Sequence, residues 1–190
     1  MLGVKKKTFD VGVTAQMNAR LQPMHRGHFE EPLFDLLEQK KLGEVTGGGT
    51  QLAEEPYGVA YCDIEIHLAD SKQATLDAVI AELNRLGAPK GSKLHVDGKA
   101  IPFGVHEGLA VFLNGMDLPD EVYRDCDINH VIDECERLMR GGGAMLSYWE
   151  GSSETALYFY GPSFAKMKAA IEPFLASYPL CQKCRLEQTA

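Results

Sequence analysis

Residues 9–15 read FDVGVTA and residues 109–113 read LAVFL, and these two stretches decide the fold. In both, apolar residues recur at every second position, which is the period of a β-strand with one buried face. In the first stretch, Phe9, Val11, Val13 and Ala15 form the apolar face. Val13 and Val111 are 98 residues apart, and this offset relates much of one half of the chain to the other.

The same offset carries a helical pattern from the first half to the second. The matched apolar positions are Leu33, Phe34 and Leu37, which fall on Val131, Ile132 and Cys135. Gly43 falls on Gly141, and each directly follows the helical pattern. We therefore expect both glycines to adopt a positive φ and close the last turn of their helices.

Each half then continues with a hairpin, a second amphipathic helix and a closing strand. The hairpins are expected over Glu44–Leu52 with Val59–Leu68, and over Gly142–Trp149 with Thr155–Tyr160. This βαββαβ order resembles the ferredoxin-like fold, in which two helices cover one face of a four-stranded antiparallel sheet. We predict an α+β protein, a tandem duplication of this unit over residues 1–98 and 105–190, with residues 97–104 as a linker.

Two consequences follow from this prediction. Each unit leaves one sheet face without helices, so we expect the second copy to cover it by stacking sheet on sheet or by joining the sheets edge to edge. The fold by itself does not identify a function, because it hosts many unrelated activities.

The composition narrows the expected location and partners. No apolar run approaches the roughly 18 residues that span a bilayer, and the residues after Met1–Lys7 are not apolar as in a signal peptide. Five cysteines, an odd number, favour a reducing compartment, so we expect a cytoplasmic protein. The net charge of -8 argues against nucleic acid and favours a basic protein as partner.

The glycine-rich stretch of the first hairpin is one candidate contact site. Gly47, Gly48 and Gly49 lie within an expected strand, where glycines mark a bulge or the close approach of another backbone or ligand. We assign binding to Thr46, Gly48 and Thr50. The alternative is a bulge that bends the hairpin over its own helix. A phosphate loop is disfavoured because no helix N-terminus with Lys-Ser/Thr follows.

A polar row and an aromatic group supply further candidates. Asp63, Glu65 and His67 alternate along one strand and share a face, so they could perform acid–base chemistry, bind a metal, recognise a basic partner or simply face solvent. Trp149 belongs to a group of aromatic residues on the second hairpin, which could form a core between the units or line a cleft. We include Asp63, Glu65, His67 and Trp149 among the expected binding residues.

Metal and nucleophile chemistry have weaker support. Cys181 and Cys184 have the spacing of a zinc knuckle, and His25 and His28 would complete four ligands if the two segments met. A redox pair would need its first cysteine at a helix N-terminus, whereas this pair follows a helix. No Ser or Cys sits in a Gly-x-Ser-x-Gly turn. We therefore expect no catalytic residues, no metal and no cofactor.

These observations favour a non-catalytic cytoplasmic module that binds another protein. Its concrete form would be an acidic inhibitor, or immunity-type antidote, of a basic partner. The alternative is an enzyme or small-molecule sensor with a cleft between the two units. That alternative requires Asp63, Glu65 and His67 to converge on one concave site, with Trp149 as a further candidate for its lining.

Overall fold

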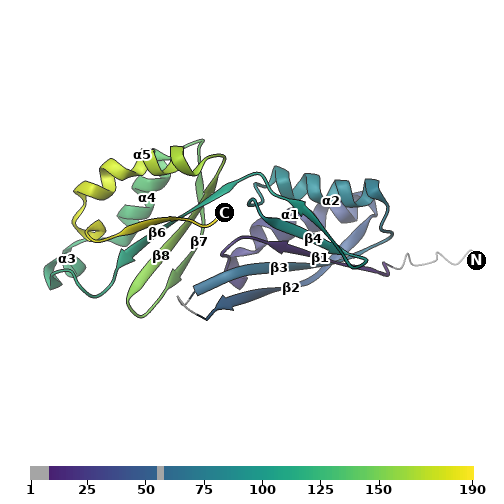
Figure 1. Cartoon of the computed structure of the whole chain (residues 1–190), viewed down its shortest axis with the longest axis horizontal. Coiled ribbons are helices and arrows are strands. Elements are labelled where there is room, and N and C mark those ends of the chain that lie inside the picture. Colours follow the sequence, from purple (N-terminus) through teal and green to yellow (C-terminus); the bar gives the residue numbers. More distant parts are fainter. Residues whose placement is uncertain (1–8, 55–57) are drawn as a thin grey trace, which may run out of the picture.

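The computed structural model describes residues 9–54 and 58–190. Met1–Lys7, the basic segment considered above as the start of a signal peptide, lies outside the described residues. It contains a five-stranded sheet of order β2-β3-β1-β4-β5 and a four-stranded sheet of order β7-β8-β6-β9 (Figure 1). The first unit consists of β1 (Val11–Met17), a 3-10 turn (Pro23–His25), α1 (Gly27–Lys40), β2 (Gly43–Ala53), β3 (Gly58–Leu68), α2 (Gln73–Arg85), β4 (Ser92–Val96) and β5 (Lys99–Phe103). The second consists of β6 (Glu107–Asn114), α3 (Asp120–Asp125), α4 (Ile128–Leu138), β7 (Ala144–Glu150), β8 (Glu154–Gly161), α5 (Phe164–Ser177), a 3-10 turn (Pro179–Cys181) and β9 (Arg185–Gln188).

This order confirms the prediction of two ferredoxin-like α+β units with antiparallel sheets. Val13 and Val111 occupy the same place in the two sheets, on the central strands β1 and β6. Leu37 and Cys135 are fully buried on α1 and α4, the first long helix of each unit. Among the described residues, no helix combines the length and the apolar character needed to cross a bilayer.

Three details differ from the sequence-based expectations. Residues 97–104 are not a linker, because β5 lies within them and pairs with β4 as a fifth strand of the first sheet. The positive φ after α1 belongs to Lys41 (55°), whereas Gly43 opens β2 at a point where an added Cβ would lie 2.4 Å from the His67 carbonyl oxygen. Gly141 has the expected positive φ of 78°. The short helix α3 was not predicted.

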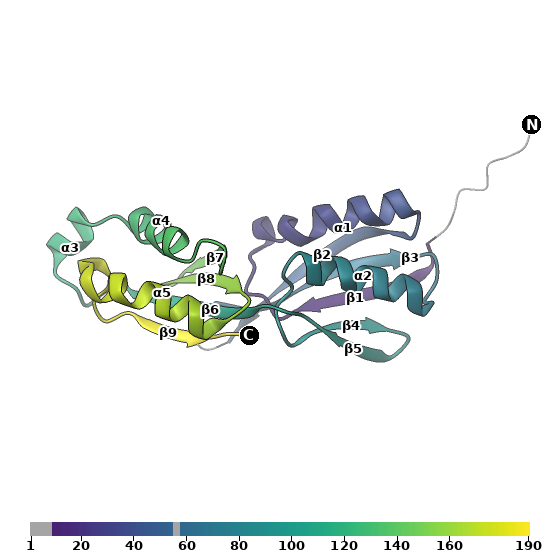
Figure 2. The same ribbon diagram turned by 90° about the horizontal axis from the view of Figure 1, so that it is seen from above.

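The two units lie side by side, so the sheets neither stack nor form one continuous sheet (Figures 1 and 2). The helix-free face of the second sheet is instead packed against one end of the first unit. Its buried residues join the hydrophobic core of the first unit, and they are Ala110, Phe112, Ala156, Tyr158 and Tyr160. The prediction that part of the aromatic group forms a core between the units is confirmed for Tyr158 and Tyr160. Phe159 points to the other face and packs under α4 and α5.

Hydrogen bonds from the segment after β1 align the two units. The Arg20 amide donates to the Tyr160 hydroxyl at 2.7 Å, and the Gln22 side-chain amide donates to the Tyr148 carbonyl at 2.6 Å. The segment following β1 is therefore fixed to β7 and β8 by directional bonds as well as by apolar contact.

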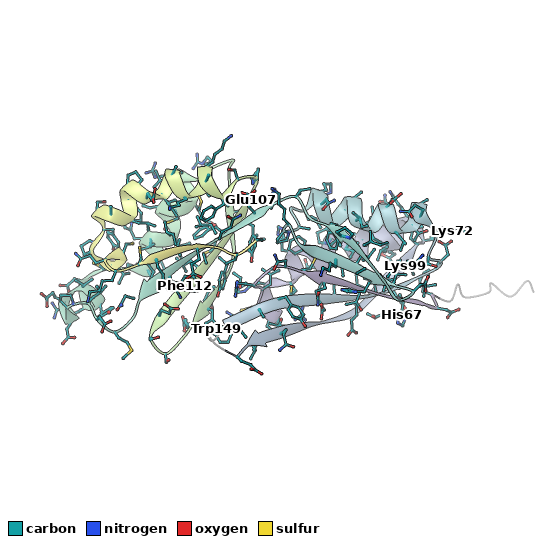
Figure 3. The ribbon with its side chains drawn as sticks, in the orientation of Figure 1. His67, Lys72, Lys99, Glu107, Phe112 and Trp149 are labelled. Carbon is teal, nitrogen blue, oxygen red and sulfur yellow. The ribbon has the colours of Figure 1, made fainter. Side chains whose placement is uncertain are left out.

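The connection between the units is tightly held. Gly104 has a φ of 112°, its amide donates to the Asn84 side chain at 2.9 Å, and a Cβ there would lie 1.9 Å from the Pro89 carbonyl oxygen. Glu107 then accepts a hydrogen bond from Lys90 in the first unit and another from the backbone amide of Phe164 at the start of α5, both at 2.7 Å (Figure 3). The connection is thus bonded to both units.

The buried bond at Tyr160 gives a first prediction. Tyr160→Phe removes the acceptor of the Arg20 amide in a site where the ring is 2% exposed. Leaving a buried amide without a partner costs about 1–3 kcal/mol, so the midpoint of chemical denaturation is expected to fall. Tyr61→Phe, at a half-buried position of β3, is the matched control. It is expected to change the free energy of unfolding by less than about 0.5 kcal/mol. Equal midpoints for wild type and Tyr160→Phe would contradict this account of the junction.

Candidate functional site

The glycine-rich part of β2 contains the predicted bulge and bends over the start of α1. The register between β2 and β3 shifts between Val45 and Gly47, which leaves Thr46 exposed at the bulge. The Arg26 guanidinium donates to the Thr50 hydroxyl at 2.9 Å and to the Gly48 carbonyl at 3.4 Å. Gly48 and Thr50 therefore contact their own helix, which supports the bulge interpretation for these two residues.

Gly48 is held by close contacts that its neighbour Gly49 lacks. A Cβ on Gly48 would lie 2.5 Å from the Asp63 carbonyl oxygen and 2.8 Å from a Glu30 carboxylate oxygen, whereas nothing lies within 4 Å of a Cβ on Gly49. Gly48→Ala is expected to destabilise the fold by about 1–3 kcal/mol, because either β3 or the start of α1 must move to make room for the methyl group. Gly49→Ala should be neutral or slightly stabilising. Thermal unfolding of the two variants measures the change in stability. An equal fall in melting temperature for both would argue against the close contact of Gly48 with Asp63 and Glu30.

The polar row lies on the helix-free face of the first sheet, as its alternation predicted. Glu65 and His67 are exposed on this face, while Asp63 is partly buried, opposite Gln16 of β1. One carboxylate oxygen of Asp63 is buried without a hydrogen-bond partner among the described residues. Burial raises the pKa of Asp63; His95 lowers it and Glu65 raises it by smaller amounts.

His95, the histidine that acts on the pKa of Asp63, is not on a neighbouring strand. Asp63 lies on β3 and His95 on β4, with β1 between them. Strands are spaced about 4.8 Å apart, so the two backbones are separated by roughly 10 Å. Among the described residues, no hydrogen bond joins the two side chains, and direct proton transfer needs heavy atoms within that reach.

The raised pKa of Asp63 has a consequence for stability. A carboxyl group whose pKa is higher in the folded than in the unfolded state stabilises the fold as pH falls, and its ionised form is unfavourable at neutral pH. Asp63→Asn is expected to raise stability at pH 7, with the gain shrinking as pH is lowered through the pKa of the wild-type carboxyl. Glu65→Gln, on the exposed part of the same strand, is the control. The denaturation midpoints of wild type and both variants are measured across a pH series. A lower midpoint for Asp63→Asn than for wild type at pH 7 would contradict the expectation.

Trp149 lies at the junction of the units, well away from the exposed part of the polar row. Its indole is near Gly58 at the start of β3, where an added Cβ would be 3.8 Å from the ring. His67 is nine residues further along the same strand, or about 30 Å at 3.4 Å per residue. Figure 3 shows the two side chains apart. His67 and Trp149 therefore do not line one cleft.

The two halves of the suggested zinc site also lie apart. The His25 ring contacts Ser147 at 2.9 Å beside the junction, and His28 lies 3.1 Å from the Leu86 carbonyl oxygen. Cys181 and Cys184 follow the C-terminal end of α5, whereas its N-terminal end is the one next to the junction. Within residues 9–54 and 58–190, no three or more His, Cys, Asp or Glu side chains are grouped to hold a metal ion.

A surface that the sequence reasoning missed lies between α1 and the edge strand β2, which run beside each other (Figure 2). We call it the α1–β2 groove. One part, of about 420 Å³, is lined by Glu30, Glu31, Phe34, Asp35 and Val45. The other, of about 350 Å³, is lined by Phe9, Phe34, Glu38, Lys41, Gly43 and Glu44. Phe34 is shared by both parts and is 43% exposed.

The groove combines apolar surface with negative charge. Its lining includes five carboxylates and one lysine, and the Glu30 carboxylate is bonded to Arg26 at 2.8 Å. The corresponding depression of the second unit, between α4 and β7, is lined by Asp133 and Glu136 together with Arg137 and Arg140. Acidic character is therefore a property of the first unit, and the shared fold does not impose it.

The sequence contained a signal for this groove. Leu33 and Leu37 form the buried stripe of α1, and Phe34 follows Leu33 directly, so it projects beside the core. Acidic residues surround it on both sides along the helix. An aromatic residue outside the buried stripe, within a run of like charges, is the pattern of an apolar contact in an acidic setting.

Comparisons with known proteins find solved structures of low similarity. No family model matches the chain, and no curated protein matches it. Solved structures with a similar fold include the first two RRM domains of yeast poly(U) binding protein, 10% identical with a TM-score of 0.27, covering 94% of this chain and 99% of that one. Others are the regulatory subunit of aspartate kinase from Thermus flavus (12%, TM-score 0.28, covering 88% and 94%) and a putative monooxygenase from Fusobacterium nucleatum (8%, TM-score 0.33, covering 95% and 92%). Similarity at this level does not identify a ligand, partner or activity.

Proposed function

We propose that this chain is a non-catalytic binding module that recognises a basic partner protein through the α1–β2 groove. The observation that carries the proposal is the 43% exposed ring of Phe34 within a lining of five carboxylates. Exposed apolar surface with a polar rim is typical of protein contact sites. The concrete form we favour is an acidic inhibitor, of the immunity type, that covers a basic surface of its partner.

The chemistry of the groove defines the partner. Phe34 offers an apolar contact, and Glu31, Asp35 and Glu38 surround it with charges that favour arginine and lysine. The complementary surface is an apolar side chain flanked by basic residues. The net charge of -8 adds long-range attraction and speeds association with such a surface. Thr46 is exposed at the bulge and directly follows Val45 of the groove lining in the chain.

The second unit provides a matched control for this proposal. Asp35 and Glu38 of α1 lie 98 residues before Asp133 and Glu136 of α4, and all four are exposed. Reversing the charges of either pair changes the net charge by the same amount. Only the α1 pair lies in the acidic groove, so the two double variants separate a local contact from a general effect of net charge.

Capture of native lysate proteins on the immobilised full chain tests the proposal. Wild type is expected to retain one basic protein in a salt-sensitive manner, and the affinity of that protein is then measured by titration. Asp35→Lys with Glu38→Lys should weaken it by about tenfold or more, because like charges oppose association. Phe34→Ala should weaken it by about fivefold or more through loss of the apolar contact, with less change in salt dependence.

The control variant decides the outcome. Asp133→Lys with Glu136→Lys should retain the partner within about threefold of wild type. Equal weakening by both double variants would show that only overall charge matters and would overturn the groove assignment. Recovery of no basic protein at low salt by wild type would count against the binding function itself.

A further inference from the structure

Four of the five cysteines gather in the helix-covered core of the second unit. Cys135 and Cys181 are buried in it, and Cys126 and Cys184 are partly buried against it. The fifth, Cys62, is buried in the core of the first unit. The second unit therefore holds a local concentration of sulfur for which the proposed binding function has no use.

Cys181 and Cys184 are the two ends of a tight turn. The Cys184 amide donates to the Cys181 carbonyl oxygen at 3.1 Å, and Lys183 between them has a φ of 60°. A turn closed in this way brings its first and fourth Cα atoms within about 7 Å. Two cysteine side chains at that separation can reach a common atom.

Both cysteines also line a cavity that opens to the surface. It has a volume of about 520 Å³, and its lining includes Lys168, Glu172, Gln182 and Lys183 with the two cysteines. The Lys183 ammonium group donates to the Asp117 carbonyl oxygen at 2.8 Å. A small ion can therefore reach the turn from solvent, and positively charged side chains stand beside it.

Burial opposes the ionisation of both thiols. Burial, with smaller contributions from Cys184, Cys135 and Cys126, raises the pKa of Cys181 to about 12. Burial likewise raises the pKa of Cys184. Both thiols are therefore protonated at neutral pH, which makes them poor nucleophiles. A metal ion bound by thiolates would supply the missing positive charge and displace the protons.

We propose that Cys181 and Cys184 form a two-thiolate site for a soft monovalent metal ion, of which Cu(I) is the representative. Thiolates select soft ions, and a monovalent ion of this class is satisfied by two of them. Structural zinc sites take four protein ligands and catalytic ones three, whereas the described residues contain no group of three or more His, Cys, Asp or Glu side chains that could hold a metal ion.

The binding reaction balances without any change of oxidation state. Two thiols and one Cu(I) give a bis-thiolate complex with one net negative charge, and two protons are released to solvent. Of the two lysines on the cavity wall, Lys168 is paired with Glu172 at 3.4 Å, so Lys183 is the one that offsets the remaining charge. Since two protons leave, the apparent affinity should rise by as much as about 100-fold per pH unit near neutrality.

The test uses the reduced full chain without oxygen and Cu(I) supplied as its complex with the coloured chelator bicinchoninate. Wild type should withdraw one equivalent of Cu(I), seen as loss of the chelator colour. Cys184→Ser should lower the affinity by about 100-fold or more, since one of the two ligands is lost. Cys181→Ser should do the same, and circular dichroism verifies that each variant is folded.

One further cysteine variant serves as a control, and a pH series checks the proton count. Cys62 lies in the other unit, so Cys62→Ser should bind Cu(I) as wild type does. Transfer of no Cu(I) to wild type, retained affinity in folded Cys184→Ser, or an affinity independent of pH would each overturn the site. None of these outcomes bears on the α1–β2 groove, which lies in the other unit.

Discussion

The helix-free face of the second sheet has to be covered, and this constraint determines the rest of the molecule. Tyr158 and Tyr160 present too much apolar surface to remain in water, and the first unit covers them with the segment after β1 and the start of β3. Burying large aromatic rings is worth several kcal/mol in total. Because the cover comes from the end of the first unit, the helix-free face of the first sheet remains exposed.

The two units share a topology and differ in what their surfaces offer. On the helix-free face of the first sheet, Glu65 and His67 are exposed, whereas the matching face of the second sheet carries buried tyrosines. Beside the first helix of each unit, the groove is acidic around Phe34 in one case and balanced by Arg137 and Arg140 in the other. A common fold has thus given one unit that attaches to its neighbour and one that presents a charged surface.

The sequence predicted the order of elements well because the governing patterns are local. Alternation in β1 and β6 and the helical stripe containing Leu37 each extend over a few residues, and the structure confirms them. The strand β5 escaped notice because it is short, contains Pro102 and lies between Gly98 and Gly104, which together are typical of a loop. Its pairing with β4 depends on the folded sheet and leaves no pattern in the local sequence.

The site was less predictable, for a related reason. Asp63, Glu65 and His67 do share a face, but sequence alone gives no measure of the distance from Trp149 to His67, which depends on which end of β3 meets the second unit. The α1–β2 groove involves residues from the start of the chain, a helix and an edge strand. Only the acidic run around Phe34 on α1 is local enough to be seen in the sequence, and the sequence analysis did not recognise it as a site.

The bonded connection at Gly104 also affects what the protein can do for a ligand. With Gly104 against Pro89 and Glu107 bonded to both Lys90 and α5, the chain between the units has few torsions left to vary. The conformational entropy of orienting one unit on the other is therefore lost during folding and not during association. A molecule large enough to touch both units would meet a preorganised platform of fixed spacing, and a greater part of its contact energy would remain as affinity.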